Sequence, residues 1–263
     1  MGNLKDKKLF LLDMDGTIYL DNDLFDGTLE FLDHVKSIGG KAMFLTNNSS
    51  KSVDAYIEKL GRLGIAACKN DFFTSTDATI QFFSDKTYKK IYALGTASFK
   101  SQLREAGLPI TDRLEDDVDC LCMGFDTELT FQKLEDACIL LGRGVDYIAT
   151  NPDFVCPTWY GFVPDCGSVS IMLKNATGRE PRFIGKPQPE MPLLAIQKAG
   201  FDKEQAVIIG DRIYTDIASG VNAGISSILV LSGETDLATL EASEVKPEFV
   251  YDNIATILAD LKK

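Results

Sequence analysis

The chain has 263 residues, of which 45% are hydrophobic and 25% are charged. This length and composition fit a globular protein with one large domain or two smaller ones. The 39 Asp and Glu residues outnumber the 27 Lys and Arg residues, which gives a formal net charge of −12. Because such a surface repels phosphate backbones and anionic lipid, we expect neither a nucleic-acid partner nor a membrane partner.

The amino-terminal segment carries Lys5, Lys7 and Lys8, but the apolar run that follows covers only residues 9–12. That run is too short for a signal peptide, and no stretch reaches the length of a transmembrane helix. The six cysteines lie mostly in apolar or mixed segments and lack the paired spacing of a zinc site. We therefore expect buried free thiols and a cytoplasmic location.

Strand and helix patterns alternate along the first 82 residues. The segment KLFLLDMDGT (8–17) predicts a short strand that ends in two aspartates, Asp13 and Asp15. A helix pattern covers 27–38, a second strand ends at Thr46, DFFTS (71–75) predicts a third strand, and an amphipathic helix follows at about 76–84. Alternation with short connections predicts an α/β fold with a doubly wound parallel sheet.

The middle of the chain has a different character. Residues 83–183 contain their own strand patterns (KKIYALG, DVDCLCMGF and VDYIATN), their own helices, and a cluster of Pro and Gly residues. Beyond this segment the alternation returns, with a helix at 189–199, a strand at 206–210 and a helix over 215–223. We interpret 83–183 as a second α/β domain inserted into a first domain made of 1–82 and 184–263. An insertion near the carboxyl edge of the sheet would act as a lid over the two aspartates.

Polar residues follow the predicted strands at the points where they end, as with Asp13, Asp15, Thr46 and Asp211. In open α/β sheets, ligands bind at this carboxyl edge. Alternation along a strand predicts that Asp13 and Asp15 point the same way. Two carboxylates that face one spot repel each other, and a bound divalent cation is the simplest group to hold them there.

A plainer interpretation exists for each of these residues taken singly. The D-x-D-G-T string can be a strand end with a turn, since Asp and Gly are common turn residues. Lys186 can be a surface lysine, and Asp216 can be a helix amino-terminal charge. Their joint occurrence in this order favours a functional site.

As a set, these residues suit the binding of a phosphorylated molecule. Asp13 and Asp211 can share a Mg²⁺ ion, which prefers a few carboxylates together with water and substrate phosphate. Thr46 and the backbone amides that follow it can hold phosphate oxygens at a helix start. Lys186 supplies the local positive charge that an anionic substrate needs on a protein whose net charge repels it. The single histidine, His34, lies in a helix pattern, so histidine-based catalysis is not expected.

The order of the motifs DMDGT, LTNNSS, GKP and GDRIYTDI resembles the haloacid dehalogenase (HAD) superfamily of phosphatases. An insertion between the Thr46 and Lys186 segments resembles the NagD-like branch, with its type C2a cap, which includes p-nitrophenyl phosphatases and pyridoxal phosphate phosphatase. The likeness covers nearly the whole chain, including ATNPD (149–153) and GSVSIMLKNATGREP (167–181). It implies a Rossmann-like core with an inserted cap domain.

The resemblance also assigns roles to residues of the core. It implies that Asp13 is the nucleophile and forms an aspartyl-phosphate. Asp15 would protonate the leaving alcohol and then activate water. Thr46 and Asn47 would bind the phosphoryl oxygens, and Lys186 would neutralise charge on the transferring group.

For the metal, the resemblance implies a shell formed by Asp13, the backbone carbonyl of Asp15, and Asp211. Asp216 would lie outside this shell and act through water or through Lys186. The implied cofactor is therefore Mg²⁺.

Substrate contacts in this branch come from the cap, and the matching segments here are 124–126 and 151–154. We expect Phe125, Asp126, Asn151 and Asp153 to contact the substrate, together with Asn47 and Asn48 near the nucleophile. Phe125 or Phe154 can stack on a ring, although both phenylalanines fit a cap core equally well.

Four further cap and core residues are open to interpretation. Trp159 and Tyr160 can form a homodimer patch or can pack internally. Asp165 stands where relatives often have Gly, and Tyr214 stands where they often have a polar or acidic residue. These departures bear on substrate choice and cap geometry.

The sequence thus predicts a Mg²⁺-dependent hydrolase of small phosphate monoesters. Sugar phosphates, nucleotide monophosphates and p-nitrophenyl phosphate are the substrate types considered, and the partner is a small phosphorylated metabolite. The alternatives are a phosphotransferase or phosphomutase of the same superfamily, a phosphoacceptor similar to a receiver domain, and a phosphate-binding module without turnover.

Overall fold

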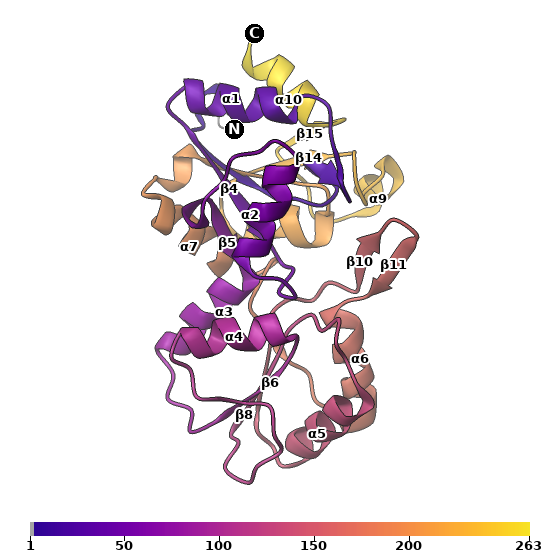
Figure 1. Cartoon of the computed structure of the whole chain (residues 1–263). Coiled ribbons are helices and arrows are strands. Elements are labelled where there is room, and N and C mark those ends of the chain that lie inside the picture. Colours follow the sequence, from indigo (N-terminus) through magenta and orange to yellow (C-terminus); the bar gives the residue numbers. More distant parts are fainter. Residues whose placement is uncertain (1–2) are drawn as a thin grey trace. The chain divides into compact units, whose positions relative to one another are not determined.

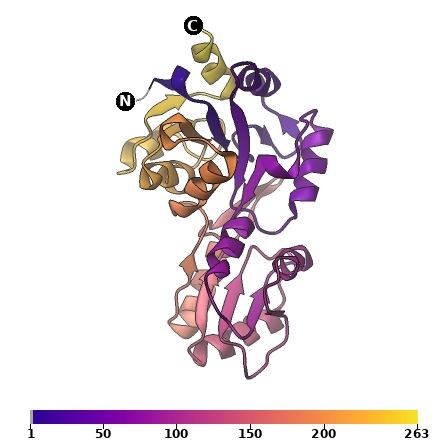
Figure 2. The same cartoon turned by 90° about the vertical axis from the view of Figure 1, so that its left-hand side faces the viewer.

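The computed structural model describes residues 3–263, and these form two compact units (Figures 1 and 2). The first unit contains the chain up to Thr46, together with Tyr56–Phe73 and Lys186–Lys263. The second unit contains Asn47–Ala55 and Thr74–Gly185. Each unit has its own parallel sheet, and each is described by itself below.

The first unit is built on a six-stranded sheet with the strand order β15-β14-β13-β1-β4-β5. Strand β1 pairs in parallel with β13 and β4, and β14 pairs in parallel with β13 and β15. The strands are β1 (Leu9–Leu12), β4 (Lys41–Thr46), β5 (Phe72–Thr74), β13 (Ala206–Gly210), β14 (Ser226–Val230) and β15 (Phe249–Tyr251).

Helices and short turns surround this sheet. They are α1 (Thr28–Ser37), α2 (Val53–Arg62), α7 (Glu190–Ala199), α8 (Ala218–Ala223), α9 (Leu237–Ala242) and α10 (Ile254–Leu261), with short 3₁₀ turns at Leu4–Asp6, Lys69–Asp71 and Lys203–Gln205. A small hairpin of β2 (Tyr19–Leu20) and β3 (Asp23–Leu24) follows β1.

The central strand β1 consists of Leu9, Phe10, Leu11 and Leu12, and none of these side chains is exposed. Such an unbroken apolar run is typical of a parallel strand that is covered on both faces. Helix α1 packs against α10, and α7 packs against β1, β4 and α8. The predicted α/β fold with parallel sheets and flanking helices is confirmed.

Strand β1 lies between β4 and β13, so the chain winds away from it in both directions along the sheet. The carboxyl ends of these three neighbouring strands lead directly into Asp13, Thr46 and Asp211. This change of winding direction is where open α/β sheets bind ligands.

The second unit contains a five-stranded parallel sheet with the order β12-β9-β8-β6-β7. Its strands are β6 (Ile91–Leu94), β7 (Ile110–Thr111), β8 (Cys120–Met123), β9 (Asp146–Ala149) and β12 (Arg182–Phe183). Its helices are α3 (Ser75–Ser84), α4 (Ala97–Glu105), α5 (Phe131–Gly142) and α6 (Cys166–Thr177). An antiparallel hairpin of β10 (Val155–Thr158) and β11 (Gly161–Pro164) precedes α6.

The two compact units do not meet at the boundary that the sequence predicts between residues 82 and 83. Residues 47–55 and helix α3 belong to the second unit, although the sequence places them in the first domain. Hydrogen bonds explain the difference: the Ser75 hydroxyl donates to the carbonyl of Asn47 (2.6 Å), and the Thr96 hydroxyl donates to that of Ser50 (2.9 Å). Such contacts between distant segments are not visible in the local sequence pattern.

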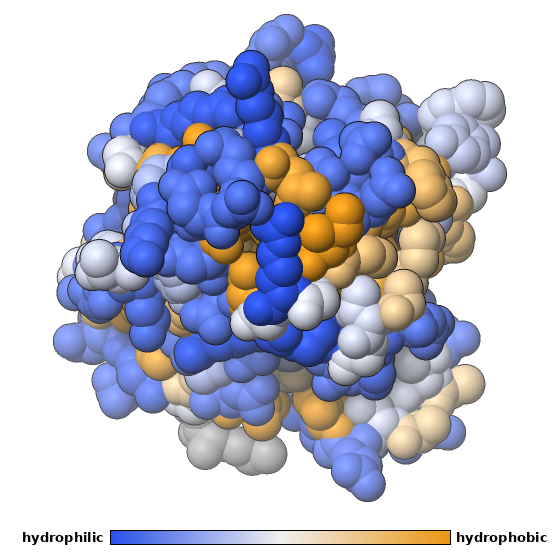
Figure 3. All heavy atoms as spheres, turned by 90° about the horizontal axis from the view of Figure 1, so that it is seen from below, coloured by the Kyte–Doolittle hydropathy of each residue, from blue (hydrophilic) through white to orange (hydrophobic). Residues whose placement is uncertain are grey.

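Within residues 3–263, no helix is both long enough and apolar enough to cross a membrane. The face shown in Figure 3 is mostly hydrophilic, with a group of apolar side chains near its centre.

Candidate active site

The site begins where β1 ends. The backbone N–H of Asp13 donates to the carbonyl of Ile209 on β13 (2.9 Å), which extends the parallel pairing by one residue. The carboxylate of Asp13 lies just beyond the strand, and its side chain is 15% exposed. A rigid central strand therefore holds this carboxylate at the carboxyl edge of the sheet.

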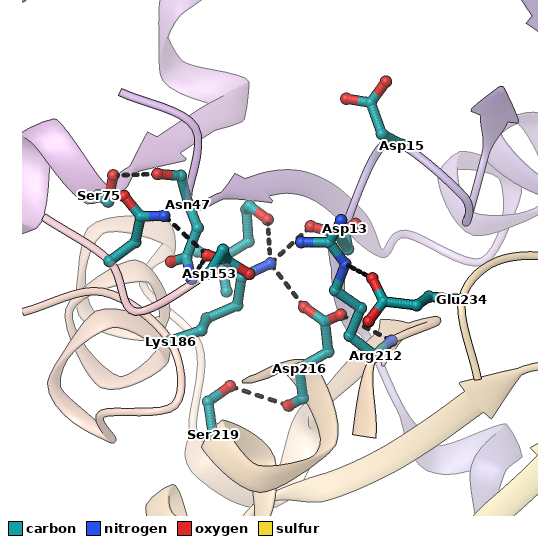
Figure 4. A network of polar contacts seen from close by, with 12 residues as sticks. Asp13, Asp15, Asn47, Ser75, Asp153, Lys186, Arg212, Asp216, Ser219 and Glu234 are labelled. Carbon is teal, nitrogen blue, oxygen red and sulfur yellow. Dashed lines mark hydrogen bonds and ion pairs between the residues drawn. The ribbon is translucent and has the colours of Figure 1, made fainter. Parts of the chain in front are cut away.

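Lys186 is the centre of the polar network shown in Figure 4. Its ammonium group is buried and donates to Asp13 Oδ1 (2.6 Å), to Asp216 Oδ1 (2.6 Å) and to the carbonyl of Leu45 (2.9 Å). A lysine ammonium has three N–H donors, and these three acceptors match that number. The sequence prediction that Lys186 belongs with Asp13 agrees with this geometry.

Asp216 reaches the network from the segment that follows β13. This segment begins with a π-helical turn, Ile213–Ile217, before the regular helix α8 starts, whereas the sequence predicts one helix over 215–223. Asp216 Oδ2 accepts a hydrogen bond from the backbone N–H of Arg212 (3.1 Å). A Cβ atom on Gly210 would overlap the Asp216 side chain, so glycine permits this close approach.

Asp211 is also buried, but its two oxygens differ. Oδ2 accepts a hydrogen bond from the backbone N–H of Glu234 (2.7 Å). Oδ1 is buried and has no hydrogen-bond donor among residues 3–263. Because a buried carboxylate oxygen without a donor is costly, this atom marks a place where the structure calls for a further positive group.

Arg212 and Glu234 were not singled out by the sequence analysis. The Arg212 guanidinium forms an ion pair with Glu234 Oε2 (2.8 Å), and Figure 4 shows the pair beside Asp13. The only sequence signal for Arg212 is its place between Asp211 and Asp216 in the GDRIYTD motif. The charge of Arg212 favours the ionised form of these neighbouring carboxyl groups.

Burial and mutual repulsion dominate the electrostatics of the three carboxyl groups. Burial raises the pKa of Asp13, and the charge of Lys186 opposes this rise. Burial and the charges of Asp13 and Asp216 raise the pKa of Asp211 to about 8. Burial and the charge of Asp13 raise the pKa of Asp216 to about 6, against the effect of Lys186.

The pKa of Lys186 is shifted by opposing effects. Burial lowers this pKa, but the charges of Asp13 and Asp216 outweigh burial and leave it raised. Lys186 is therefore a firmly protonated cation that faces two of the three carboxyl groups. The cluster carries more negative groups than this one buried ammonium neutralises.

One oxygen from each of Asp13, Asp211 and Asp216 lies within 4.8 Å of the others. Carboxylate oxygens at this separation match the ligands that hard divalent cations prefer. The cluster is therefore a candidate metal site made of residues that follow β1 and β13, with Asp216 contributed by the π-helical turn Ile213–Ile217.

Asp15 does not join this cluster, which corrects the expectation that Asp13 and Asp15 point the same way. Figure 4 shows the carboxylate of Asp15 turned away from Asp13 and Lys186. It accepts a hydrogen bond from the Tyr19 hydroxyl (3.3 Å) and lies 3.5 Å from Lys59 Nζ. Strand β1 ends at Leu12, so the alternation of a strand no longer applies at these positions.

Thr46 is the last residue of β4 and is buried at the carboxyl end of that strand. Its neighbour Leu45 supplies a carbonyl to Lys186, so the chain before Thr46 is tied to the lysine of the cluster. The structure thus brings the end of β4 to the same sheet edge as Asp13.

Asn47 and Asn48 begin the first segment of the second unit, and their side chains have partners there. Asn47 Nδ2 donates to Asp153 Oδ2 (2.7 Å). Asn48 Oδ1 accepts from both the backbone N–H (3.0 Å) and the hydroxyl (2.7 Å) of Ser50, which shapes the turn. The sequence predicts that both side chains bind substrate, and the structure shows that they also make hydrogen bonds that support the loop.

Asn151 and Asp153 lie in a buried polar network of the second unit. Asn151 Nδ2 donates to Asp153 Oδ2 (2.9 Å) and to Asp165 Oδ1 (3.1 Å). Asp165 also caps helix α6 by accepting from the backbone N–H of Cys166. An aspartate suits this position because its side chain can cap the first turn of a helix.

Phe125 and Asp126 are also buried in the second unit. Phe125 is part of the apolar core, which is the alternative that the sequence left open. Asp126 forms an ion pair with Lys133 (2.7 Å), and its side chain is only 1% exposed. The expectation that Phe125 offers a stacking surface is corrected by this burial, whereas Phe154 is half exposed.

The hairpin of β10 and β11 presents Trp159 and Tyr160 to solvent. Trp159 is 82% exposed and Tyr160 is 63% exposed, so these side chains do not pack internally. Their rings contact each other edge to face, with centroids 5.2 Å apart.

Comparison with known proteins agrees with the motifs and the geometry. A model of haloacid dehalogenase-like hydrolases matches residues 10–109, and a HAD-hydrolase-like model matches residues 183–257. An acid sugar phosphatase of Staphylococcus aureus (strain MRSA252) is 34% identical over 261 residues, which cover 99% of this chain and 100% of the relative. The chain belongs to the haloacid dehalogenase-like hydrolases.

Solved structures identify the branch of this family. A 4-nitrophenylphosphatase from Thermotoga maritima is 40% identical, with a TM-score of 0.91 over 99% of this chain and 98% of that one. A glycerol phosphate phosphatase from Mycobacterium tuberculosis, solved in complex with magnesium, is 27% identical, with a TM-score of 0.90 over 98% of this chain and 78% of that one. The predicted HAD phosphatase branch, NagD-like and including p-nitrophenyl phosphatases, is confirmed. The predicted enzyme class, a phosphoric monoester hydrolase, is confirmed with it.

Proposed function

We propose that this HAD phosphatase hydrolyses phosphate monoesters of small molecules, uses Mg²⁺, and passes through an aspartyl-phosphate on Asp13. The observation that carries this proposal is the cluster of Asp13, Asp211 and Asp216, in which the Lys186 ammonium contacts Asp13 and Asp216. Such a cluster provides a nucleophile, a cation for phosphoryl oxygens and ligands for a metal ion in one place.

The residues present fit a Mg²⁺ ion. Asp211 Oδ1 is buried and has no donor among residues 3–263, so a cation would satisfy it. Both oxygens of Asp216 already accept hydrogen bonds, from Lys186 and from the Arg212 backbone. Asp13 and Asp211, with the backbone carbonyl of Asp15, are therefore the proposed ligands, and Asp216 acts through Lys186. When bound, the ion would supply positive charge for a phosphoryl group.

Asp13 is the proposed nucleophile because it lies at the sheet edge and contacts the Lys186 ammonium. One of its oxygens forms a bond to phosphorus while the bond between phosphorus and the ester oxygen breaks. Water then attacks the phosphorus of the aspartyl-phosphate, which releases inorganic phosphate and restores the carboxylate. Lys186 would stabilise the negative charge on the transferring group in both steps.

Asp15 is the proposed acid and base of these two steps. It would donate a proton to the departing ester oxygen and later accept a proton from the attacking water. For this role its carboxylate has to turn from the contacts with Tyr19 and Lys59. Thr46 and the backbone that leads into Asn47 are proposed to bind the phosphoryl oxygens.

The names of the relatives suggest the substrate class. They include an acid sugar phosphatase, a 4-nitrophenylphosphatase and a glycerol phosphate phosphatase. We propose sugar phosphates and related alkyl phosphates as substrates, and p-nitrophenyl phosphate as an artificial one. In the second unit, the half-exposed Phe154 is a better candidate for substrate contact than the buried Phe125.

Turnover of p-nitrophenyl phosphate with and without Mg²⁺ tests the proposal. Chelation by EDTA is expected to abolish turnover, and added Mg²⁺ is expected to restore it. The Asp13→Asn variant is expected to lose activity by about 10⁴-fold or more, while its circular dichroism stays unchanged.

A matched control is Asp236→Asn, because Asp236 caps helix α9 in the same unit and asparagine caps helices equally well. This control is expected to keep full activity. Retained turnover in Asp13→Asn would refute the proposal. Transfer of the phosphoryl group to an added alcohol without release of phosphate would identify a phosphotransferase instead.

The predicted cytoplasmic location and the predicted homodimer stay predictions. The predicted homodimer is tested by replacing the exposed residues Trp159 and Tyr160. If these side chains form the contact, replacing both with serine converts a dimer to a monomer in analytical ultracentrifugation, and an unchanged sedimentation coefficient contradicts it.

A further inference from the structure

The carboxylate of Asp15 is held by two side chains that no part of the proposed mechanism uses. The Tyr19 hydroxyl donates to Asp15 Oδ2 (3.3 Å), and Lys59 Nζ lies 3.5 Å from Asp15 Oδ1. Lys59 Nζ also lies over the ring of Tyr19, 3.8 Å from its centroid. A cation over an aromatic face is attracted to it, so the three side chains form one connected group.

Backbone contacts hold Tyr19 in place. Its side chain is fully buried, and it begins the β2–β3 hairpin opposite Leu24. The loop between Asp13 and Tyr19 is closed by hydrogen bonds from the N–H of Gly16 to the carbonyl of Tyr19 (2.8 Å) and from the N–H of Ile18 to that of Met14 (3.0 Å). The Tyr19 hydroxyl is therefore a stationary donor.

Lys59 is equally constrained, because it extends from helix α2 and its side chain is only 15% exposed. Asp15, by contrast, has a side chain that is 34% exposed. Of the three side chains, that of Asp15 is the most exposed. If the contacts among these three side chains break, we therefore expect the Asp15 carboxylate to be the part that rotates.

We propose that Tyr19 and Lys59 are positioning residues that hold the Asp15 carboxylate away from the reacting groups, and that the proton-transfer step requires these contacts to break. Figure 4 shows that the Asp15 carboxylate points away from Asp13, Lys186 and Asp216. The inference rests on the proposed function, because it assigns Asp15 the acid–base role.

The leaving group of the substrate separates this role from a merely structural one. An alkyl phosphate releases an alkoxide that needs a proton, whereas p-nitrophenolate departs without one. The value of kcat/KM reports the steps up to the first departure of the leaving group. The position of Asp15 therefore affects kcat/KM for an alkyl phosphate and leaves that for p-nitrophenyl phosphate nearly unchanged.

The test compares Tyr19→Phe and Lys59→Met with the wild type, using glycerol phosphate and p-nitrophenyl phosphate. Tyr19→Phe keeps the ring under the ammonium and removes only the donor to Asp15. Each variant is expected to raise the ratio of alkyl to aryl kcat/KM by about two- to fivefold, because a partly exposed contact of this kind is worth little. Lys59→Arg keeps the positive charge beside Asp15 and is expected to leave the ratio near the wild-type value.

Two matched controls come from the same unit. Tyr251→Phe removes a hydroxyl that donates to the carboxylate of Asp260 (2.7 Å). Lys198→Met removes an ammonium that lies 5.7 Å from the centroid of the Phe73 ring. Both controls are expected to leave the ratio unchanged, since neither contacts Asp15.

Equal changes for both substrates would overturn the proposal, because they would indicate a general structural effect. A selective fall for the alkyl phosphate would also overturn it, since the contacts would then support the productive position of Asp15. If the wild type hydrolyses neither substrate, the proposed function itself fails. If it hydrolyses both and the ratio does not move, only the positioning role of Tyr19 and Lys59 fails.

Discussion

Each unit of this phosphatase buries a cluster of polar side chains, and the two clusters differ in how their carboxylates are satisfied. In the second unit, the amide groups of Asn47 and Asn151 donate to Asp153, and Asn151 also donates to Asp165. In the first unit, three carboxyl groups lie close together, and the single ammonium of Lys186 contacts two of them, those of Asp13 and Asp216.

The difference lies in what each cluster still lacks. The second cluster provides its own donors, so it stabilises the fold without any further partner. The first cluster holds three carboxyl groups and the one ammonium of Lys186, and Asp211 Oδ1 has no donor among residues 3–263. A network that is incomplete without a cation is suited to binding one, whereas a complete network is suited to holding a loop in place.

The largest expected effect comes from Lys186→Met, which removes the ammonium that lies 2.6 Å from both Asp13 and Asp216. Removal of one partner of a buried ion pair costs about 3–5 kcal/mol, because the other charge stays buried without compensation. We also expect a loss of about 10²–10³-fold in kcat, as for other groups that stabilise transition-state charge. Urea unfolding and steady-state kinetics measure the two effects.

Lys198→Met is the control for this experiment, because Lys198 belongs to the same unit and donates to the carbonyl of Phe72 (2.9 Å). It is expected to change kcat less than twofold (a rough figure for a residue outside the site). If Lys186→Met kept wild-type kcat, Lys186 would not contact the transferring group.

A smaller effect is expected from Asn151→Leu in the second unit. Asp153 and Asp165 would each lose a donor while staying buried, which costs about 2–3 kcal/mol in the free energy of unfolding. The KM of the folded enzyme is expected to stay within about twofold of the wild-type value. Unchanged stability with a large rise in KM would show instead that Asn151 contacts the substrate, as the sequence predicted.

The strands of the first unit and the main site residues were predictable because each depends on a local pattern. The apolar run before Asp13, the glycine before Lys186 and the buried strand before Asp211 all bring functional residues to strand ends or sharp turns. Parallel strands place their carboxyl ends on one edge, so the assembly of the site followed from the fold class.

The features that the sequence did not predict depend on side-chain direction and on partners distant in sequence. Asp15 turns away because the chain leaves β1 after Leu12, which a strand-based rule does not foresee. Phe125 has an aromatic ring that could stack on a substrate, and only the packing of the second unit shows that this ring belongs to the hydrophobic core. The bond between Asn47 and Asp153 joins residues 106 positions apart, so no local pattern reveals it.

The smallest of the expected effects concerns thermal stability and pH. Without metal, burial and neighbouring charges raise the pKa of Asp211 to about 8 and that of Asp216 to about 6. Both values exceed the unfolded value of about 3.9, so the folded state binds more protons and loses stability as the pH rises from about 4 to 8. Mg²⁺ favours the ionised carboxylates, so its stabilising effect is expected to grow over the same range.

Thermal melts at about pH 5.5 and pH 8, with and without saturating Mg²⁺, measure this linkage. We expect Mg²⁺ to raise the Tm by about 2–6 °C at the higher pH and by less at the lower pH. The Asp211→Asn variant is expected to lose most of this gain. If Mg²⁺ raised the Tm of the wild type and of Asp211→Asn equally, Asp211 would not be a ligand of the ion.

The most direct test of the account is to trap the covalent intermediate. The enzyme is mixed with a ³²P-labelled sugar phosphate and Mg²⁺, quenched in acid within milliseconds, and digested for peptide mapping. We predict that the label lies on Asp13, in the peptide that contains residues 8–17, and that Asp13→Asn carries none. Label on another residue, or turnover by Asp13→Asn at the wild-type rate, would contradict the assignment of Asp13 as the nucleophile.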